Sequence, residues 1–154
     1  MDVASEDEEG VLAGEPRALR GFDYGLLAGL AVAVAYGVAA ELFGLTWGLL
    51  AVGFLGGLLI GAAVTRGAWD RRMHITVRRL QVAAAGIAIG AWLIGIFLAY
   101  VISQALFPQA TTPLIERVSF DGFSDYFAGL FDSIRFIHAA SVAAMAFMAW
   151  RGAR

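Results

Sequence analysis

The fold of this chain is decided by residues 25–67, which read GLLAGLAVAVAYGVAAELFGLTWGLLAVGFLGGLLIGAAVTRG. Two long runs of small and apolar residues are separated there only by the short turn ELFGL, residues 41–45. A hydrocarbon core of roughly 30 Å needs about 20 apolar residues of helix, so each run predicts a membrane-spanning helix. Because the turn is short, the two helices are predicted to form a tight hairpin.

The composition of the whole chain also favours a membrane protein. Apolar residues make up 60% of the sequence, charged residues only 16%, and the mean hydropathy is +0.73, which is too apolar for a soluble domain with a polar surface. The 11 basic and 13 acidic residues nearly balance, so no global field attracts nucleic acid, and we expect no nucleic-acid partner. Cysteine is absent, which excludes disulfides and thiolate metal sites.

Two further apolar segments follow the hairpin. The predicted spans are residues 22–40, 46–64, 80–106 and 126–150. The period-two alternation of membrane strands is missing, and Ala and Gly dominate the spans. The expected fold class is therefore an all-α integral membrane protein, a compact bundle of four transmembrane helices within residues 21–154. Residues 1–20 are acidic and lack an apolar run, so they predict a disordered cytoplasmic tail.

The distribution of arginine predicts the orientation, because short loops rich in Arg stay in the cytoplasm. With four spans, one side of the membrane receives Arg17, Arg20, Arg66, Arg71, Arg72, Arg78, Arg79, Arg151 and Arg154. On the other side, Glu116, Asp121 and Asp125 outnumber Arg117. We therefore expect a multi-pass protein of a prokaryotic inner membrane with both termini in the cytoplasm.

Glycine recurs along the predicted spans at a spacing of four residues. In lipid, small residues at this spacing mark faces where helices pack closely. The glycines assigned to helix packing are Gly25, Gly29, Gly37, Gly53, Gly57, Gly61, Gly86 and Gly90. On the first two spans the stripes predict a back-to-back hairpin of the glycine-zipper kind. The alternative is a small-residue surface that serves oligomerisation or lines a thin-walled pore.

The loop between the second and third spans carries two arginine pairs, seven residues apart. They are Arg71 with Arg72 and Arg78 with Arg79. An Arg near an anionic leaflet contributes about 1 kcal/mol, so these residues are predicted to contact lipid headgroups. The alternative is a docking site for an acidic cytosolic partner. Asp70 and His74 supply only two ligands at helical spacing, so no metal site is predicted.

The last predicted span is unusual because it contains ionisable side chains. Asp132, Arg135 and His138 follow one another at intervals of three residues, close enough to interact on a helix. One interpretation is structural: an Asp132–Arg135 pair at the interface and a histidine bonded within the bundle. The other is a polar site for a ligand, ion or proton, with His138 as the titrating group.

The hairpin also resembles the opening of a group of uncharacterised small bacterial four-span membrane proteins. The matching residues are Gly48, Gly53, Gly57, Gly61, Val64, Arg66 and Gly67. The resemblance covers about forty residues and implies the architecture, without implying any activity. Members often have a soluble segment ahead of the spans, which here is reduced to the acidic tail.

These features favour a non-enzymatic protein, an accessory, anchor or scaffold subunit of a membrane complex. No catalytic residue, metal ligand set or cofactor motif is predicted, because nothing supplies a nucleophile with a base in reach. The expected partners are membrane lipids, with a homo-oligomer or a larger membrane complex as further possibilities. The alternative function is a small oligomeric transporter or channel that uses Asp132, Arg135 and His138 as its polar site.

Overall fold

The computed structural model describes residues 4–43, 47–68, 77–106, 112–133 and 135–153. Side chains are described for all of these except residues 4–18, 77, 131–133 and 135. Within this part of the chain every regular element is a helix and none is a strand, which confirms the all-α class for these residues. The helices are α1 (Ala4–Glu41), α2 (Gly48–Ala68), α3 (Val77–Ala105), α4 (Leu114–Arg117), α5 (Phe120–Ser133) and α6 (Arg135–Gly152).

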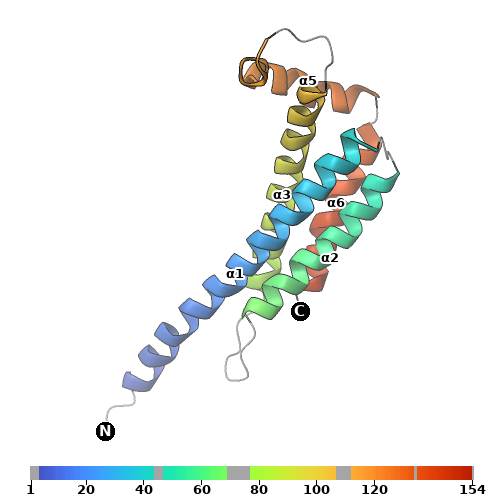
Figure 1. Ribbon diagram of the computed structural model, residues 1–154. Helices are drawn as coiled ribbons and strands as arrows, with labels where there is room; N and C mark the ends of the chain where they lie inside the picture. Colours follow the sequence, from blue (N-terminus) through green and yellow to red (C-terminus); the bar gives the residue numbers. More distant parts are fainter. Residues whose placement is uncertain (1–3, 44–46, 69–76, 107–111, 134, 154) are drawn as a thin grey trace.

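Among the described residues, three helices are long and apolar enough to cross a membrane. The spanning segments are Leu19–Glu41 of α1, Gly48–Ala68 of α2 and Arg78–Ala105 of α3. They correspond to the first three predicted spans and indicate a membrane protein. Figure 1 shows these helices side by side with α6, and the end of α2 and the start of α3 lie at the same end of the bundle as the C-terminus.

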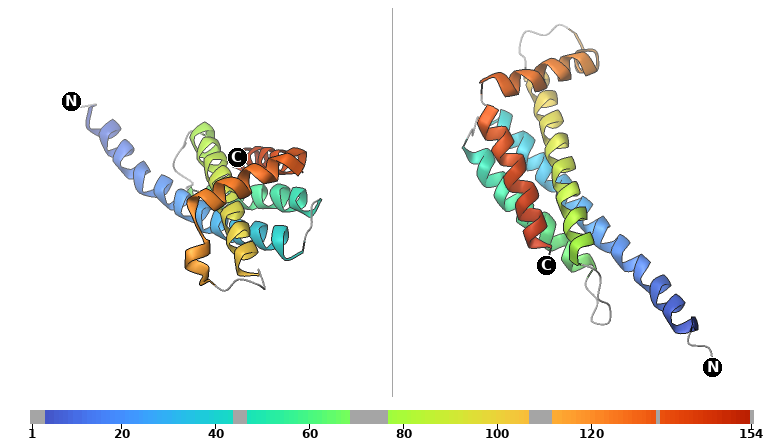
Figure 2. Two further views of the ribbon diagram at one scale, coloured as in Figure 1. Left: turned by 90° about the horizontal axis from the view of Figure 1, so that it is seen from above. Right: turned by 180° about the vertical axis from the view of Figure 1, so that it is seen from behind.

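The segment predicted as one span over residues 126–150 is instead two helices. Its first part belongs to α5, which lies across the end of the bundle, and α6 then runs back beside α2 and α3 (Figure 2). The reason lies in the amphipathic sequence of α5, in which Asp121 and Asp125 are exposed while Phe123 and Phe127 pack against the core. A helix of this kind buries one face and keeps the other in a polar environment.

The start of α1 also differs from the prediction. The helix begins at Ala4, inside the acidic tail that was expected to be disordered, and its first turns project beyond the bundle (Figure 1). Ala, Leu and Glu are good helix formers, and Glu is favourable near a helix N-terminus. Extending an existing helix also avoids the cost of nucleation, so the apolar span supports helix in the residues before it.

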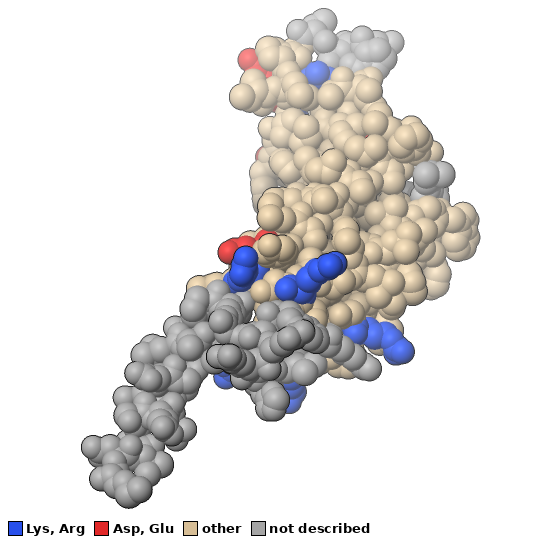
Figure 3. Space-filling model, turned by 60° about the horizontal axis from the view of Figure 1, so that its bottom comes forward, with Lys and Arg blue, Asp and Glu red and all other residues tan. Residues whose placement is uncertain are grey.

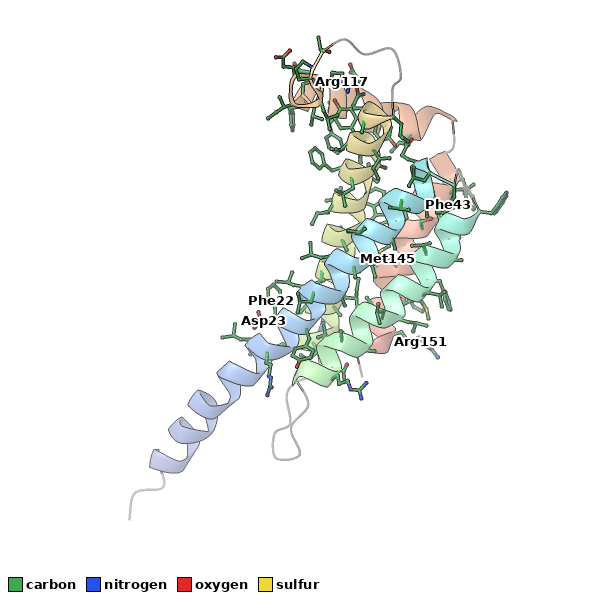
Figure 4. All side chains as sticks on the ribbon, in the orientation of Figure 1. Phe22, Asp23, Phe43, Arg117, Met145 and Arg151 are labelled. Atoms are coloured by element: carbon green, nitrogen blue, oxygen red, sulfur yellow. The ribbon has the colours of Figure 1, made fainter. Side chains whose placement is uncertain are left out.

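The glycines of α2 face a helix other than the predicted one. A Cβ atom at Gly53 would lie 2.8 Å from the carbonyl oxygen of Ser141 in α6. Gly57 and Gly61 make the same kind of close approach to Met145 (labelled in Figure 4) and Ala149. Gly53, Gly57 and Gly61 therefore allow the backbone of α6 to pack closely on α2. They do not form the predicted back-to-back contact with α1.

The hairpin contact between α1 and α2 uses other glycines, among them Gly56. A Cβ atom at Gly56 would lie 2.5 Å from the Cγ1 atom of Val32, so on this face a branched side chain of α1 fills the groove. Gly56 lies between Gly53 and Gly57 on the helix and points toward a second neighbour. Two glycine faces on one helix allow α2 to pack closely against both α1 and α6.

The glycines of α1 contact two neighbouring helices, α2 and α3. A Cβ atom at Gly29 would lie 3.0 Å from the side chain of Ile87 in α3, and one at Gly37 would lie 2.9 Å from the carbonyl oxygen of Gly95. Gly25 stands against Ile87 and also against Val64 of α2. These contacts bring α1, α2 and α3 together around a core of small residues and branched side chains.

Candidate functional site

A buried polar cluster lies where α1, α3 and α6 meet. It consists of Tyr36, Trp92 and His138, which are respectively 0%, 6% and 5% exposed. The Tyr36 hydroxyl oxygen lies 3.0 Å from His138 Nδ1, and Trp92 Nε1 donates to the same oxygen at 3.2 Å. One hydroxyl therefore joins side chains from three helices.

The donors and acceptors of this cluster are complementary. The indole N–H of Trp92 can only donate, so the Tyr36 oxygen accepts from it. The hydroxyl hydrogen of Tyr36 remains free to donate to His138 Nδ1. This arrangement favours a neutral imidazole that carries its hydrogen on Nε2.

The surroundings of the cluster are closely packed. Ser141, one turn further along α6, is fully buried and donates to the carbonyl oxygen of Ile137 at 2.7 Å. The backbone of Ser141 is also where Gly53 of α2 makes its close approach. On the side of α5, Phe127 packs edge-on against Trp92 with 6.2 Å between ring centroids. The cluster is thus enclosed by all four long helices and by α5.

The predicted polar trio is not a single cluster on one helix. Asp132 belongs to α5, Arg135 begins α6, and the side chains of both lie outside the described residues. His138 bonds to Tyr36, a residue that the sequence analysis did not select. The one signal in the sequence was Trp92, which lies in the middle of an apolar run, whereas aromatic residues with polar tips usually lie at the ends of a span. Tyr36 gave no such signal, because it lies near the end of its predicted span.

A second set of polar contacts fixes α4 and α5 over the end of the bundle. The Tyr100 hydroxyl of α3 donates to the carbonyl oxygen of Arg117 at 3.1 Å and accepts from the backbone N–H of Ser119 at 3.3 Å. The Tyr126 hydroxyl of α5 donates to the carboxylate of Glu41, the last residue of α1. Burial and this neighbouring carboxylate raise the pKa of Tyr126 above its usual range, so its phenol stays protonated and able to donate.

The predicted headgroup arginines are only partly described. Arg71 and Arg72 lie outside the described residues, whereas Arg78 and Arg79 are exposed at the start of α3. Figure 3 shows basic side chains gathered at this end of the bundle. The described arginines there are Arg20, Arg66, Arg78, Arg79 and Arg151.

Two of the predicted packing glycines have no packing partner among the described residues. A Cβ atom at Gly86 or at Gly90 of α3 would have nothing within 4 Å. The prediction treated all glycines at this spacing alike, but the spacing alone does not say which face of a helix a neighbour occupies. These two glycines face outward from the bundle beside α1.

The described residues hold no group of three or more His, Asp or Glu side chains that suits a metal ion. The cluster around Tyr36 offers hydrogen bonds between fixed partners, an arrangement that stabilises the packing of helices. Comparison with protein-family models, with curated proteins and with solved structures found no match to this chain.

Proposed function

We propose that this protein is a small non-enzymatic membrane protein that serves as an accessory, anchor or scaffold subunit of a membrane complex. The observation that carries the proposal is the buried hydrogen bond between His138 and the Tyr36 hydroxyl, which also accepts from Trp92. An intramembrane histidine is a candidate for transport or proton transfer by default. Here the Nδ1 atom of His138 bonds to the Tyr36 hydroxyl, which is itself bonded to Trp92 of α3. These bonds link three helices, as a histidine with a structural role would do.

The proposal includes α6 as the fourth span. Its 18 residues extend about 27 Å at 1.5 Å per residue, close to a hydrocarbon core of roughly 30 Å. Arg151 stands in its last turn, where a long side chain can reach the headgroups. Close backbone contacts with α2 support the placement of α6 beside a helix that is itself apolar enough to span.

The orientation that we propose has both termini in the cytoplasm of a prokaryotic cell, at its inner membrane. The exposed arginines at one end of the bundle support it. At the other end, Glu41, Glu116, Asp121 and Asp125 outnumber Arg117. In this orientation α5 lies along the outer surface of the membrane.

The test is purification of the chain from native membranes at its natural level of expression. We expect a second protein at a fixed ratio, and reconstituted vesicles containing the purified chain alone should show no solute or proton flux. The Tyr24→Phe variant, altered at an exposed tyrosine of α1, serves as the control for the His138→Ala variant and should retain the partner. A chain that runs alone as an oligomer, with a flux that His138→Ala abolishes while the helices remain folded, would establish the transporter instead.

A further inference from the structure

An apolar groove runs along the outside of the bundle between α1 and α3. Its volume is about 350 Å³. Phe22, Leu26 and Leu30 form the α1 wall, and all three are partly exposed (Phe22 is labelled in Figure 4). On the α3 side the groove is lined by Gly86 and Gly90, whose missing side chains leave a trough in the helix surface.

This trough is open, unlike the other glycine faces of the bundle. At Gly37, Gly53 or Gly57 an added Cβ atom would meet the backbone of a neighbouring helix, whereas at Gly86 and Gly90 it would meet none of the described residues. In a membrane an open apolar trough is filled by something from the lipid phase. The occupant is either a hydrocarbon chain or another helix.

The length of the groove matches one leaflet of a bilayer. Its α3 side runs from Ala83 to Ile94, which is about 16 Å at 1.5 Å per residue. Half of a hydrocarbon core of roughly 30 Å is about 15 Å. The groove therefore reaches from the headgroup boundary to the middle of the membrane, as a lipid chain does.

The volume also suits a hydrocarbon chain. An extended chain is about 4–5 Å across at van der Waals contact, so a 16 Å length fills on the order of 300 Å³. The groove holds about 350 Å³, which suits one chain.

A cationic side chain stands at the headgroup end of the groove. Arg79 precedes Ala83 by one helical turn and Gly86 by two, so it lies on the groove face of α3, and it is exposed. A guanidinium group binds phosphate through two parallel hydrogen bonds. Arg78 is equally exposed but is rotated about 100° away from that face.

We propose that the groove binds one acyl chain of an anionic phospholipid, with Arg79 on the headgroup phosphate. The exposed Asp23 of α1 stands beside Phe22 at the same end (Figure 4) and limits the affinity by repelling the phosphate. Only the choice of leaflet rests on the proposed function. In the orientation given above, the groove lies in the cytoplasmic leaflet. Anionic lipids give this leaflet its negative surface potential.

Native mass spectrometry of the purified chain tests the site, with dipalmitoyl phosphatidylglycerol and dipalmitoyl phosphatidylcholine as the two probes. We expect one retained phosphatidylglycerol in preference to phosphatidylcholine. Gly86→Leu should fill the groove and remove the bound lipid, since its Cβ atom meets no described neighbour and the fold is kept. Arg79→Gln should weaken phosphatidylglycerol binding about fivefold, and Asp23→Asn should strengthen it.

Matched controls separate this site from general lipid contact. Arg78→Gln changes the same charge one residue away, and Ala62→Leu adds the same bulk on an exposed face of α2, so both should leave lipid retention unchanged. Equal losses in Arg78→Gln and Arg79→Gln would overturn the proposal. So would a Gly86→Leu variant that changes the oligomeric state while lipid retention is unaffected, because the groove would then be a helix interface. For this measurement the chain is overexpressed and purified on its own, without a partner protein, so failure of the subunit proposal leaves the lipid result unaffected.

Discussion

Gly57→Ala will destabilise the bundle, whereas Gly86→Ala will leave its stability unchanged or raise it slightly. The same methyl group is added to a helix glycine in both variants. At Gly57 it would stand 3.0 Å from the Cα and carbonyl carbon of Met145 and closer still to the carbonyl oxygen, so α2 and α6 must move apart. Overpacking of this kind costs about 1–3 kcal/mol.

The Gly86 variant isolates the effect of the backbone alone. With no described atom within 4 Å of the new methyl group, the remaining effect is helix propensity, which favours Ala over Gly by up to about 1 kcal/mol. The free energy of unfolding in lipid micelles, measured by titration with a denaturing detergent, should therefore fall for Gly57→Ala and stay the same or rise for Gly86→Ala. Equal losses in the two variants would contradict the close approach of α2 and α6.

Tyr36→Phe will destabilise the bundle although it removes a single oxygen atom. The hydroxyl serves two buried partners, so the variant leaves His138 Nδ1 and Trp92 Nε1 unsatisfied. An unsatisfied buried polar group costs about 1–3 kcal/mol, although hydrogen bonds between membrane helices average nearer 0.6 kcal/mol. We expect a loss of about 1–3 kcal/mol in the free energy of unfolding.

A control and a second substitution make this prediction specific. Tyr24→Phe makes the same chemical change on an exposed face of α1 and should alter stability by less than about 0.5 kcal/mol. In a double-mutant cycle with His138→Leu, Tyr36→Phe should cost less than it does alone, because the histidine no longer needs a partner. Additive costs would show that the two side chains are independent and would remove the basis for treating His138 as a structural tie.

Hydropathy predicted three spans because length and apolar character suffice to define them. The same measure joined α5 and α6 into one span, since an apolar window does not register that Asp121 and Asp125 alternate with Phe123 and Phe127 on two faces. The helical start of α1 was missed for another reason: composition describes the acidic tail alone, whereas the helix is supported by the span that follows it.

Glycine spacing predicted which residues allow close packing but not which helix each one meets. Gly57 faces α6 and Gly56 faces α1, a difference set by the rotation of α2 in three dimensions. The same limit applied to the candidate site. His138 was selected because it is ionisable, while its partner Tyr36 is 102 residues away in the chain, and the choice of that partner depends on how α1 and α6 are placed.

In the topology that we propose, four spans form the bundle and α6 returns the chain to the cytoplasm. The chain has no cysteine, so single cysteines can be introduced at the exposed positions Ser124, Arg66 and Arg151 and treated in intact cells with a membrane-impermeant maleimide. We predict labelling at Ser124 without permeabilisation, and labelling at Arg66 and Arg151 only after it. Labelling at Arg151 from the same side as Ser124 would mean that α6 does not cross the membrane and would contradict the account.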